Sequence, residues 1–388
     1  MKIGLLGCGV IGYGVYDIIN NGDFAFCKDL EVVKALVKTP EEITMDFMTN
    51  DVDSIIANDE IDTVVEVMGG IHPAYEFITT AMKNGKNVVT ANKAVVAAHY
   101  EEFVTLAAEH GVSFKYEASV GGGIPWIKAL RQAMRIDQIT SIGGIMNGTT
   151  NYILSTMEAE HIDFDVCLHD AQQKGYAEAN PSADIDGIDV RNKLLISSSL
   201  AYSTYVPFEN IPTMGIRSIT LDDLDYFASI GKSIRLYADS LRSGNKYACR
   251  IEPTLFDKNT AQAATLSNFN IFSLNGATIG ELKFIGQGAG RYPTANAIVQ
   301  DIIDILTDDR SMLSESFTSE LTYDEELLVG SYYVRAPKGA EQSVLSALES
   351  FSPEAIEGAS GAFTVKEVAT ARLHSALKDI SGVFFARI

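Results

Sequence analysis

The stretch Lys2-Ile3-Gly4-Leu5-Leu6-Gly7-Cys8-Gly9-Val10-Ile11-Gly12 decides how the first part of the chain folds. Residues 2–6 predict a buried strand, and the pattern G-x-G-x-x-G follows directly and opens a helix. In that context Gly7 permits a tight turn, Gly9 lets the backbone approach a pyrophosphate, and Gly12 lets the helix pack on the strand. A glycine turn that only ends a strand is the alternative. We expect a dinucleotide to contact Gly7, Gly9, Val10, Ile11 and Gly12.

Short apolar strands alternate with helical patterns through about the first 120 residues. Helical stretches between successive strands are what a parallel, doubly wound sheet requires. We therefore predict a Rossmann-type α/β domain over residues 1–124. Its expected strands are residues 2–6, 31–37, 62–68, 86–90 and 112–116.

The pattern changes after Gly123 and predicts a second, α+β domain over residues 125–285. An acidic, weakly patterned segment at 309–326 predicts a linker to a tail, residues 327–388. The expected elements before the linker are a helix at 125–135, a strand at 138–145, helices to about residue 202, strands at 232–239, 246–255 and 278–285, and a helix at 295–306.

The composition of the chain excludes several classes of partner. A formal net charge of −21 repels phosphate backbones and anionic lipid headgroups, so neither nucleic acid nor a membrane surface is an expected partner. The 4 cysteines are scattered without a C-x-x-C pair, which favours a reducing compartment. No apolar stretch reaches the roughly 18 to 20 residues that span a bilayer. We expect a cytoplasmic protein that acts on a small molecule.

The end of the second strand indicates which dinucleotide binds. An acidic residue there would accept hydrogen bonds from the adenosine ribose hydroxyls. Here the strand ends Val37-Lys38-Thr39, without an acid. A cation and a hydroxyl suit a 2′-phosphate better, so Lys38 favours NADP, and NAD remains possible. An ordinary solvated lysine is the alternative.

Two polar segments carry the candidate chemistry. Thr90-Ala91-Asn92-Lys93 follows an apolar strand, at the edge of an open α/β sheet where ligands bind, so Thr90 and Lys93 are site candidates. Asp189 and Lys193 are spaced i, i+4 and share one helix face. A solvated ion pair is the alternative, but the apolar residues that follow Lys193 predict a buried helix. A buried charged pair favours a polar ligand as partner.

These motifs, in this order, resemble homoserine dehydrogenase over residues 1 to about 308. Departures from the family pattern are Asn180 in place of Asp, Gln287 in place of Pro, and Trp126 in place of an aliphatic residue. The resemblance implies the NAD(P)-dependent interconversion of L-homoserine and L-aspartate 4-semialdehyde, in threonine and methionine biosynthesis. It also implies a homodimer or higher homo-oligomer formed through the second domain, with residues 286–308 completing the first. Besides the glycine loop and Thr90–Lys93, it rests on residues 117–125, 147–152, 174–193 and 286–295.

The resemblance implies a role for each site residue. Glu178 would bind the amino group of homoserine, Asp189 would orient the substrate, and Lys193 would protonate the carbonyl oxygen during aldehyde reduction. An ammonium there suits the alkoxide charge that hydride transfer develops. Lys93 would touch nicotinamide or substrate and assist the proton transfer. Gly286 and Gly288 would belong to a loop beside the cofactor, with helix packing as the alternative.

The segment that begins at Glu117 resembles the monovalent-cation site of the same family. Its implied sodium ligands are the carboxylate of Glu117 and the backbone carbonyls of Val120, Gly122 and Ile124. A tight glycine turn between domains is the alternative.

The tail resembles a shortened ACT domain, an amino-acid-binding module. Its expected elements are a strand at 329–334, helices at 342–351 and 365–378, and a strand at 383–388, which is about one strand short. An intact threonine sensor and a degenerate appendage that supports oligomerisation are both possible. We favour the appendage, because a missing strand would leave a sheet edge that a partner subunit could cover.

Two other functions fit parts of the sequence. One is a different Rossmann amino-acid dehydrogenase, such as an aspartate dehydrogenase, against which the spacing of Glu178, Asp189 and Lys193 argues. The other is a non-catalytic, amino-acid-sensing binding protein. Homoserine-dependent formation of NADPH would separate these alternatives from the main hypothesis.

Overall fold

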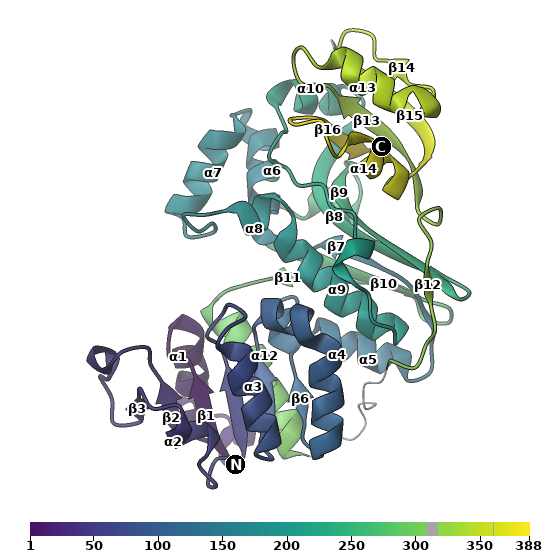
Figure 1. The fold of residues 1–388 in the computed structure, drawn as a ribbon. Helices are drawn as coiled ribbons and strands as arrows, with labels where there is room; N and C mark the ends of the chain where they lie inside the picture. Colours follow the sequence, from purple (N-terminus) through teal and green to yellow (C-terminus); the bar gives the residue numbers. More distant parts are fainter. Residues whose placement is uncertain (308–316, 360) are drawn as a thin grey trace. The chain divides into compact units, whose positions relative to one another are not determined.

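A computed structural model describes residues 1–307, 317–359 and 361–388 (Figure 1). The chain divides into two compact units. The first unit contains residues 1–136, 199–205 and 286–319, and the second contains residues 137–198, 206–285 and 320–388. Among the residues so described, no helix is both long and apolar enough to cross a membrane.

The first unit is built on a six-stranded parallel sheet with the order β3-β2-β1-β4-β5-β6. This is the predicted doubly wound sheet, and all five strands predicted for it are present with ends that differ by a few residues. The additional strand, β3, has only 2 residues and therefore has no sequence period to detect. The strands are β1 (Lys2–Leu6), β2 (Glu31–Leu36), β3 (Met48–Thr49), β4 (Thr63–Glu66), β5 (Asn87–Thr90) and β6 (Phe114–Lys115).

Helices cover both faces of this sheet (Figure 1). On one face, α1 (Val10–Tyr16) and α12 (Arg291–Leu306) pack with Ile3 and Leu5 of β1 in one buried apolar cluster. The alternate residue Gly4 faces the other side, beside Ile55 and Ile61. That side carries α2 (Asp53–Ile56), α3 (Ala74–Lys83) and α4 (Lys93–His110).

The second unit contains a ten-stranded sheet with the order β11-β10-β7-β8-β9-β16-β13-β15-β14, and β12 pairs with β9. The predicted strands at 138–145, 232–239 and 246–255 are present, and β8 and β9 run longer than predicted. Strand β10 was missed. Strands outside the tail are β7 (Ile139–Ile145), β8 (Lys232–Ser243), β9 (Lys246–Asp257), β10 (Phe269–Gly276) and β11 (Gly280–Gln287); helices are α6 (Gly148–Glu160), α7 (Phe164–Gln173), α8 (Ser182–Ile185), α9 (Ile188–Tyr202), α10 (Leu221–Ser229) and α11 (Ala261–Ala264).

The tail corrects two predictions. The order is strand, helix, strand, strand, helix, strand, so the strand expected to be missing is present. Residues 365–369 of the predicted helix 365–378 belong to a strand instead. The tail is also joined to the rest of the unit, because β16 pairs with β9. Within the predicted linker 309–326, residues 309–316 lie outside the described residues, and β12 (Thr322–Tyr323) pairs with β9. The tail elements are β13 (Val329–Arg335), α13 (Glu341–Leu348), β14 (Glu354–Ala355), β15 (Ala362–Ala369), α14 (Thr370–Leu377) and β16 (Phe384–Arg387).

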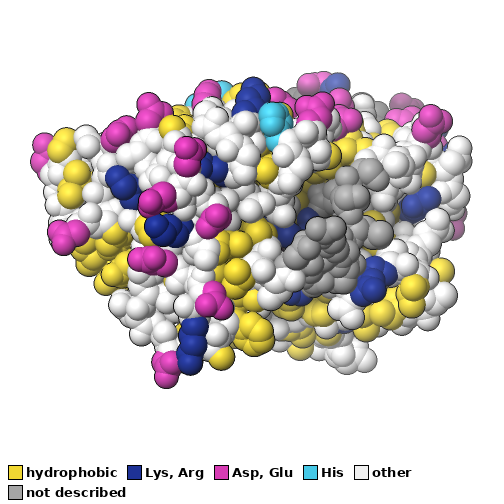
Figure 2. Space-filling view, turned by 90° about the horizontal axis from the view of Figure 1, so that it is seen from below, with side chains coloured by type: hydrophobic (Ala, Val, Ile, Leu, Met, Phe, Trp, Pro, Cys, Tyr) yellow, Lys and Arg dark blue, Asp and Glu magenta, His cyan; other side chains and the backbone are white. Residues whose placement is uncertain are grey.

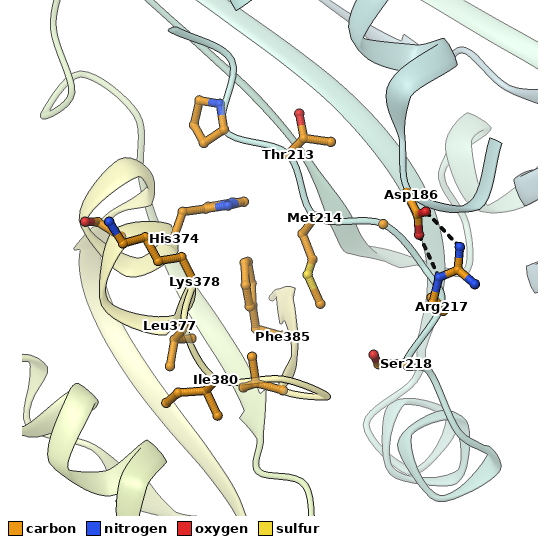
Figure 3. A pocket seen from close by; sticks show the side chains of 14 residues that line it. Asp186, Thr213, Met214, Arg217, Ser218, His374, Leu377, Lys378, Ile380 and Phe385 are labelled. Atoms are coloured by element: carbon orange, nitrogen blue, oxygen red, sulfur yellow. Dashed lines mark hydrogen bonds and ion pairs between the residues drawn. The ribbon is translucent and has the colours of Figure 1, made fainter. Parts of the chain in front are cut away.

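A pocket of about 590 Å³ lies inside the second unit, between the tail and the loop at 212–218 (Figure 3). The tail contributes His374, Leu377 and Phe385 to its wall. Across the pocket, Arg217 forms a bidentate ion pair with Asp186, at 2.7 and 2.8 Å. The pocket therefore borders the loop at 212–218, which the Arg217–Asp186 ion pair joins to the end of α8.

The charges on the surface are mixed in sign. Figure 2 shows acidic and basic side chains interspersed over one face, and the described residues of that face form no continuous basic surface.

Candidate active site

The glycine loop after β1 has the geometry that its pattern predicts. Gly7 has φ +112°, a conformation that favours glycine, and a Cβ atom on Gly12 would lie 2.1 Å from the carbonyl oxygen of Gly7. Nothing lies within 4 Å of the position that a Cβ atom on Gly9 would occupy. Gly9 precedes the first residue of α1, Val10, which is exposed. The helix N-terminus is therefore tightly packed behind and open in front, as a pyrophosphate site requires.

The loop at 286–290 packs against the loop that begins at Glu117. A Cβ atom on Gly122 would lie 2.5 Å from the backbone of Gly288, and one on Gly286 would lie 2.9 Å from Ile124. The Gly123 N–H donates to the carbonyl of Gln287 at 3.3 Å. The glycines therefore allow close backbone contact between two loops of the first unit. Contact with a cofactor remains a prediction for Gly286 and Gly288.

Thr90 and Lys93 lie at the carboxyl end of β5, where the sequence predicted them. Thr90 is fully buried, and its hydroxyl donates to Glu66, the last residue of β4, at 2.6 Å. Asn92 caps α4 by accepting from the Val95 N–H, so Lys93 is the first residue of that helix. Sequence reasoning missed Glu66, although a single acid in the apolar run of β4 is a signal that could have found it.

Lys38 lies just beyond β2 and is exposed. Its backbone N–H donates to the carboxylate of Glu42 at 3.1 Å. A backbone hydrogen bond lowers the pKa of the Glu41 carboxyl, and a hydrogen bond with the Thr39 side chain lowers it further. The predicted binding site for a 2′-phosphate therefore contains the cation of Lys38 and the carboxylates of Glu41 and Glu42.

Asp189 and Lys193 form the buried ion pair that their spacing predicts. The Lys193 Nζ donates to Asp189 Oδ2 at 2.8 Å and to the carbonyl of Met146 at 2.6 Å. The side chains are only 6% and 8% exposed. This burial does not fit the alternative of a solvated surface ion pair.

Asn147 holds this pair to a second carboxylate. Its amide nitrogen donates to Asp184 at 2.7 Å and to Asp189 at 2.8 Å, while its oxygen accepts from the Thr150 N–H at 2.8 Å as the cap of α6. Sequence reasoning recognised the segment that contains Asn147 but gave no role to Asn147 or Asp184. Their contacts join residues about 40 positions apart, and no local period shows such contacts.

Glu178, in contrast to Asn147, Asp189 and Lys193, is exposed. It lies in the exposed loop between α7 and α8, and its backbone carbonyl accepts from the Gln172 side chain at 3.1 Å. Binding of a substrate amino group by Glu178 therefore stays a prediction.

Glu117 forms a second buried cluster, within the first unit. Its two carboxylate oxygens accept from the Ile127 and Lys128 N–H groups at the start of α5 (Trp126–Met134), at 3.0 and 2.7 Å. Its own N–H donates to Asp301 at 2.9 Å. Burial, and then the charge of Asp301, raises the pKa of Glu117 to about 8. Burial also raises the pKa of Asp301 to about 6.

An open parallel sheet with a glycine loop at the start of its first helix belongs to proteins that bind dinucleotides. A buried lysine positioned by a carboxylate adds a group that can exchange a proton with a substrate. Together these features define the class as a nicotinamide-dependent oxidoreductase.

Comparison with known proteins gives the family. Residues 7–117 match the model of the homoserine dehydrogenase NAD-binding domain, and residues 125–303 match the homoserine dehydrogenase model. The chain is 42% identical over 320 residues to homoserine dehydrogenase from Synechocystis, which covers 79% of this chain and 73% of that protein. It is 37% identical to the Helicobacter pylori protein of the same name, covering 89% and 84%. The chain belongs to the homoserine dehydrogenase family.

Solved structures agree with this assignment. The homoserine dehydrogenase of Thiobacillus denitrificans superposes with a TM-score of 0.88 at 31% identity, covering 100% of this chain and 97% of that one. A Staphylococcus aureus homoserine dehydrogenase gives 0.76 at 28% identity, covering 100% and 98%. The predicted fold class, enzyme class and homoserine dehydrogenase activity on a small-molecule substrate are confirmed, and neither alternative function is favoured.

Proposed function

We propose that Lys193 is the proton donor when a nicotinamide hydride reduces L-aspartate 4-semialdehyde to L-homoserine. The observation that carries this role is the buried pair of Lys193 and Asp189, 2.8 Å apart. Hydride adds to the aldehyde carbon, negative charge develops on oxygen, and the Lys193 ammonium transfers a proton to that oxygen. Asp189 and the Met146 carbonyl fix the direction of the ammonium, which an unrestrained lysine could not hold.

Two further residues complete the proposed substrate site. Glu178 would bind the amino group of homoserine through its carboxylate. Lys93 would contact nicotinamide or substrate and assist the proton transfer. Asp189, which is already hydrogen-bonded to Asn147, would orient the substrate as well as Lys193.

NADP is the proposed physiological cofactor, with NAD as the second choice. Gly7, Gly9, Val10, Ile11 and Gly12 would bind its pyrophosphate, and Lys38 would contact the 2′-phosphate. The cofactor supplies the hydride. The carboxylates of Glu41 and Glu42 lie in the same short turn as Lys38, so we expect the preference for NADP to be modest.

A monovalent cation, sodium, is proposed at the loop that begins at Glu117. The chemistry of the loop fits, because two buried acids with raised pKa values favour a nearby positive charge. Both carboxylate oxygens of Glu117 already accept N–H groups, so the carbonyls of Val120, Gly122 and Ile124 would supply most of the ligand set. The Ile124 carbonyl also accepts from the Trp126 N–H at 2.7 Å and keeps a second lone pair.

A homodimer formed through the second unit, in the cytoplasm, is the proposed assembly. Strand β11 is an edge of the ten-stranded sheet, and its alternate residues are exposed. An edge of this kind is a surface that a second copy can cover.

The reaction is tested by following absorbance of the reduced cofactor with L-homoserine and each oxidised nucleotide in parallel. We expect homoserine-dependent formation of NADPH, with slower or weaker-binding turnover of NAD. Activity with L-aspartate but not with homoserine would contradict the proposal, and so would a lack of turnover by protein that binds the cofactor.

A further inference from the structure

We infer that Glu66 is a buried anion that makes this enzyme bind the oxidised nicotinamide more tightly, relative to the reduced form, than it otherwise would. Glu66 is fully buried at the carboxyl end of β4 and has no assigned role. The inference depends on nicotinamide binding and is independent of the proposed role of Lys193.

The position of Glu66 comes from the topology of the sheet. Glu66 is aligned with Leu6 of β1, and Gly7 follows Leu6 directly. The strand order reverses between β1 and β4, and ligands of open α/β sheets bind outside the strand ends at that point. The adenosine ribose is recognised after β2, so the nicotinamide half falls to the side of β4 and β5. Glu66 is the last residue of β4 and therefore belongs to the nicotinamide half.

The hydrogen bonds around Glu66 favour its ionised form, against the effect of burial. The Thr90 hydroxyl, which itself accepts from the Asn92 N–H at 3.0 Å, donates to Glu66 at 2.6 Å. The Met68 N–H donates at 2.8 Å. The Asn92 amide nitrogen donates at 3.4 Å, and its orientation is fixed because the amide oxygen caps α4. A carboxylate accepts from all three groups, whereas a carboxylic acid would accept from the two N–H groups and donate its own proton to the Thr90 hydroxyl.

Burial raises the pKa of the Glu66 carboxyl, and the hydrogen bonds from Thr90 and Met68 act against that rise. A desolvated carboxylate acts over a longer distance than a solvated one, because the effective dielectric around it is low. The oxidised nicotinamide ring carries a positive charge and the reduced ring carries none. A carboxylate at this position stabilises the oxidised ring selectively, and it also stabilises the positive charge that develops as NAD(P)H donates its hydride.

The test compares dissociation constants of the oxidised and reduced cofactors, measured by calorimetry on folded protein without substrate. In Glu66→Gln, binding of NADP⁺ should weaken about tenfold more than binding of NADPH, the order expected for loss of one charge several ångströms away at an effective dielectric of about 20. Glu66→Asp keeps the charge and should keep the ratio near that of the wild type. Because both forms share the same phosphates, the ratio does not depend on the choice between NADP and NAD, and the NAD⁺/NADH pair should show the same change.

Two further variants keep the inference testable if Glu66→Gln does not fold. Thr90→Val removes one donor without removing the carboxyl, so it should shift the same ratio in the same direction by a smaller factor. Glu60→Gln changes an exposed acid of the same unit and should leave the ratio unchanged. Equal weakening of both cofactor forms in Glu66→Gln and Thr90→Val would mean that Glu66 only holds the two loops together, and the inference would be overturned.

Discussion

The buried cluster around Lys193 and the buried cluster around Glu117 balance their charge in different ways. Around Lys193, an ammonium and the Asn147 amide donate to the carboxylates, so charges and donors face one another. Around Glu117, two acids lie side by side, and burial raises both pKa values despite the nearby Arg131. The first cluster pairs an ammonium with a carboxylate. The second holds two acids whose raised pKa values make their charge depend on pH.

The first prediction concerns removal of the Lys193 ammonium from its cluster, and it has the greatest magnitude. Lys193→Ala should lower kcat by about 10²- to 10⁴-fold, because it removes the proton donor and leaves the glycine loop intact. Steady-state kinetics and NADPH binding measure the two consequences separately. Lys174→Ala is a matched control, since Lys174 forms an exposed i, i+4 pair with Asp170 at 2.8 Å. A Lys193→Ala enzyme within a few-fold of wild-type turnover would remove Lys193 from the mechanism.

The second prediction concerns removal of the Asn147 amide, the neutral donor of the same cluster. Asn147→Ala leaves Asp184 and Asp189 without their shared amide, so the free energy of unfolding should fall by about 1–3 kcal/mol. Urea unfolding measures this change. Asn21→Ala, which removes an exposed hydrogen bond to Asp17, should change stability by less than about 0.5 kcal/mol. Equal effects of the two substitutions would show that Asn147 is not a structural link between the carboxylates.

The third prediction concerns how stability depends on pH and on sodium through the Glu117 cluster. Glu117 and Asp301 have folded pKa values of about 8 and about 6, above their ordinary values. The folded state therefore retains protons that the unfolded chain releases, so stability should fall as pH rises from about 5 to 8. The proposed sodium ion would replace these protons, so the gain in melting temperature from NaCl over choline chloride should be greater at pH 8.5 than at pH 6.

Asp301→Asn provides the control for that experiment. It removes one of the two acids, so the fall in stability with pH should become shallower and the sodium effect smaller. A sodium effect that is the same at both pH values would separate the cation from the acid pair.

The smallest expected effect concerns the exposed end of β2. Lys38→Glu should weaken NADP binding more than NAD binding, by about 0.2–1 kcal/mol, because an exposed ion pair contributes little. Dissociation constants for both cofactors measure the difference. Equal changes would leave Lys38 a solvated surface residue.

Local patterns predicted the first unit and the Asp189–Lys193 pair well because their signals are local. The glycine loop, the buried strands and the i, i+4 spacing of Asp189 and Lys193 each depend on residues that are close in sequence. Glu66 with Thr90, Asn147 with Asp189, and Glu117 with Asp301 are brought together by topology across 24, 42 and 184 positions. No period in the sequence contains these pairs, although the resemblance did identify most of the segments that carry them.

The tail shows how a strand can resemble a helix in sequence. Val365 and Val368 are three residues apart and both pack in the tail core, a spacing typical of a helix. In the structure they pair with Tyr332 and Gly330, two residues apart, because the register shifts there and Glu367 adopts φ +54°. This bulge places Val365 and Val368 on one face of a strand. Leu373 and Leu377 then continue the apolar spacing into α14, so the sequence predicted one helix where a strand and a helix follow one another.

The pairing of β16 with β9 has a consequence for any shortened form of this chain. Without residues 327–388, β9 would lose its neighbour on that side, and Arg250, which donates to Thr370 at 2.9 Å, would lose a buried partner. Glu252, fully buried between these elements, would face water beside an uncovered row of backbone N–H and C=O groups. Such a chain would keep every proposed catalytic residue and yet tend to aggregate, so solubility would fail before chemistry did.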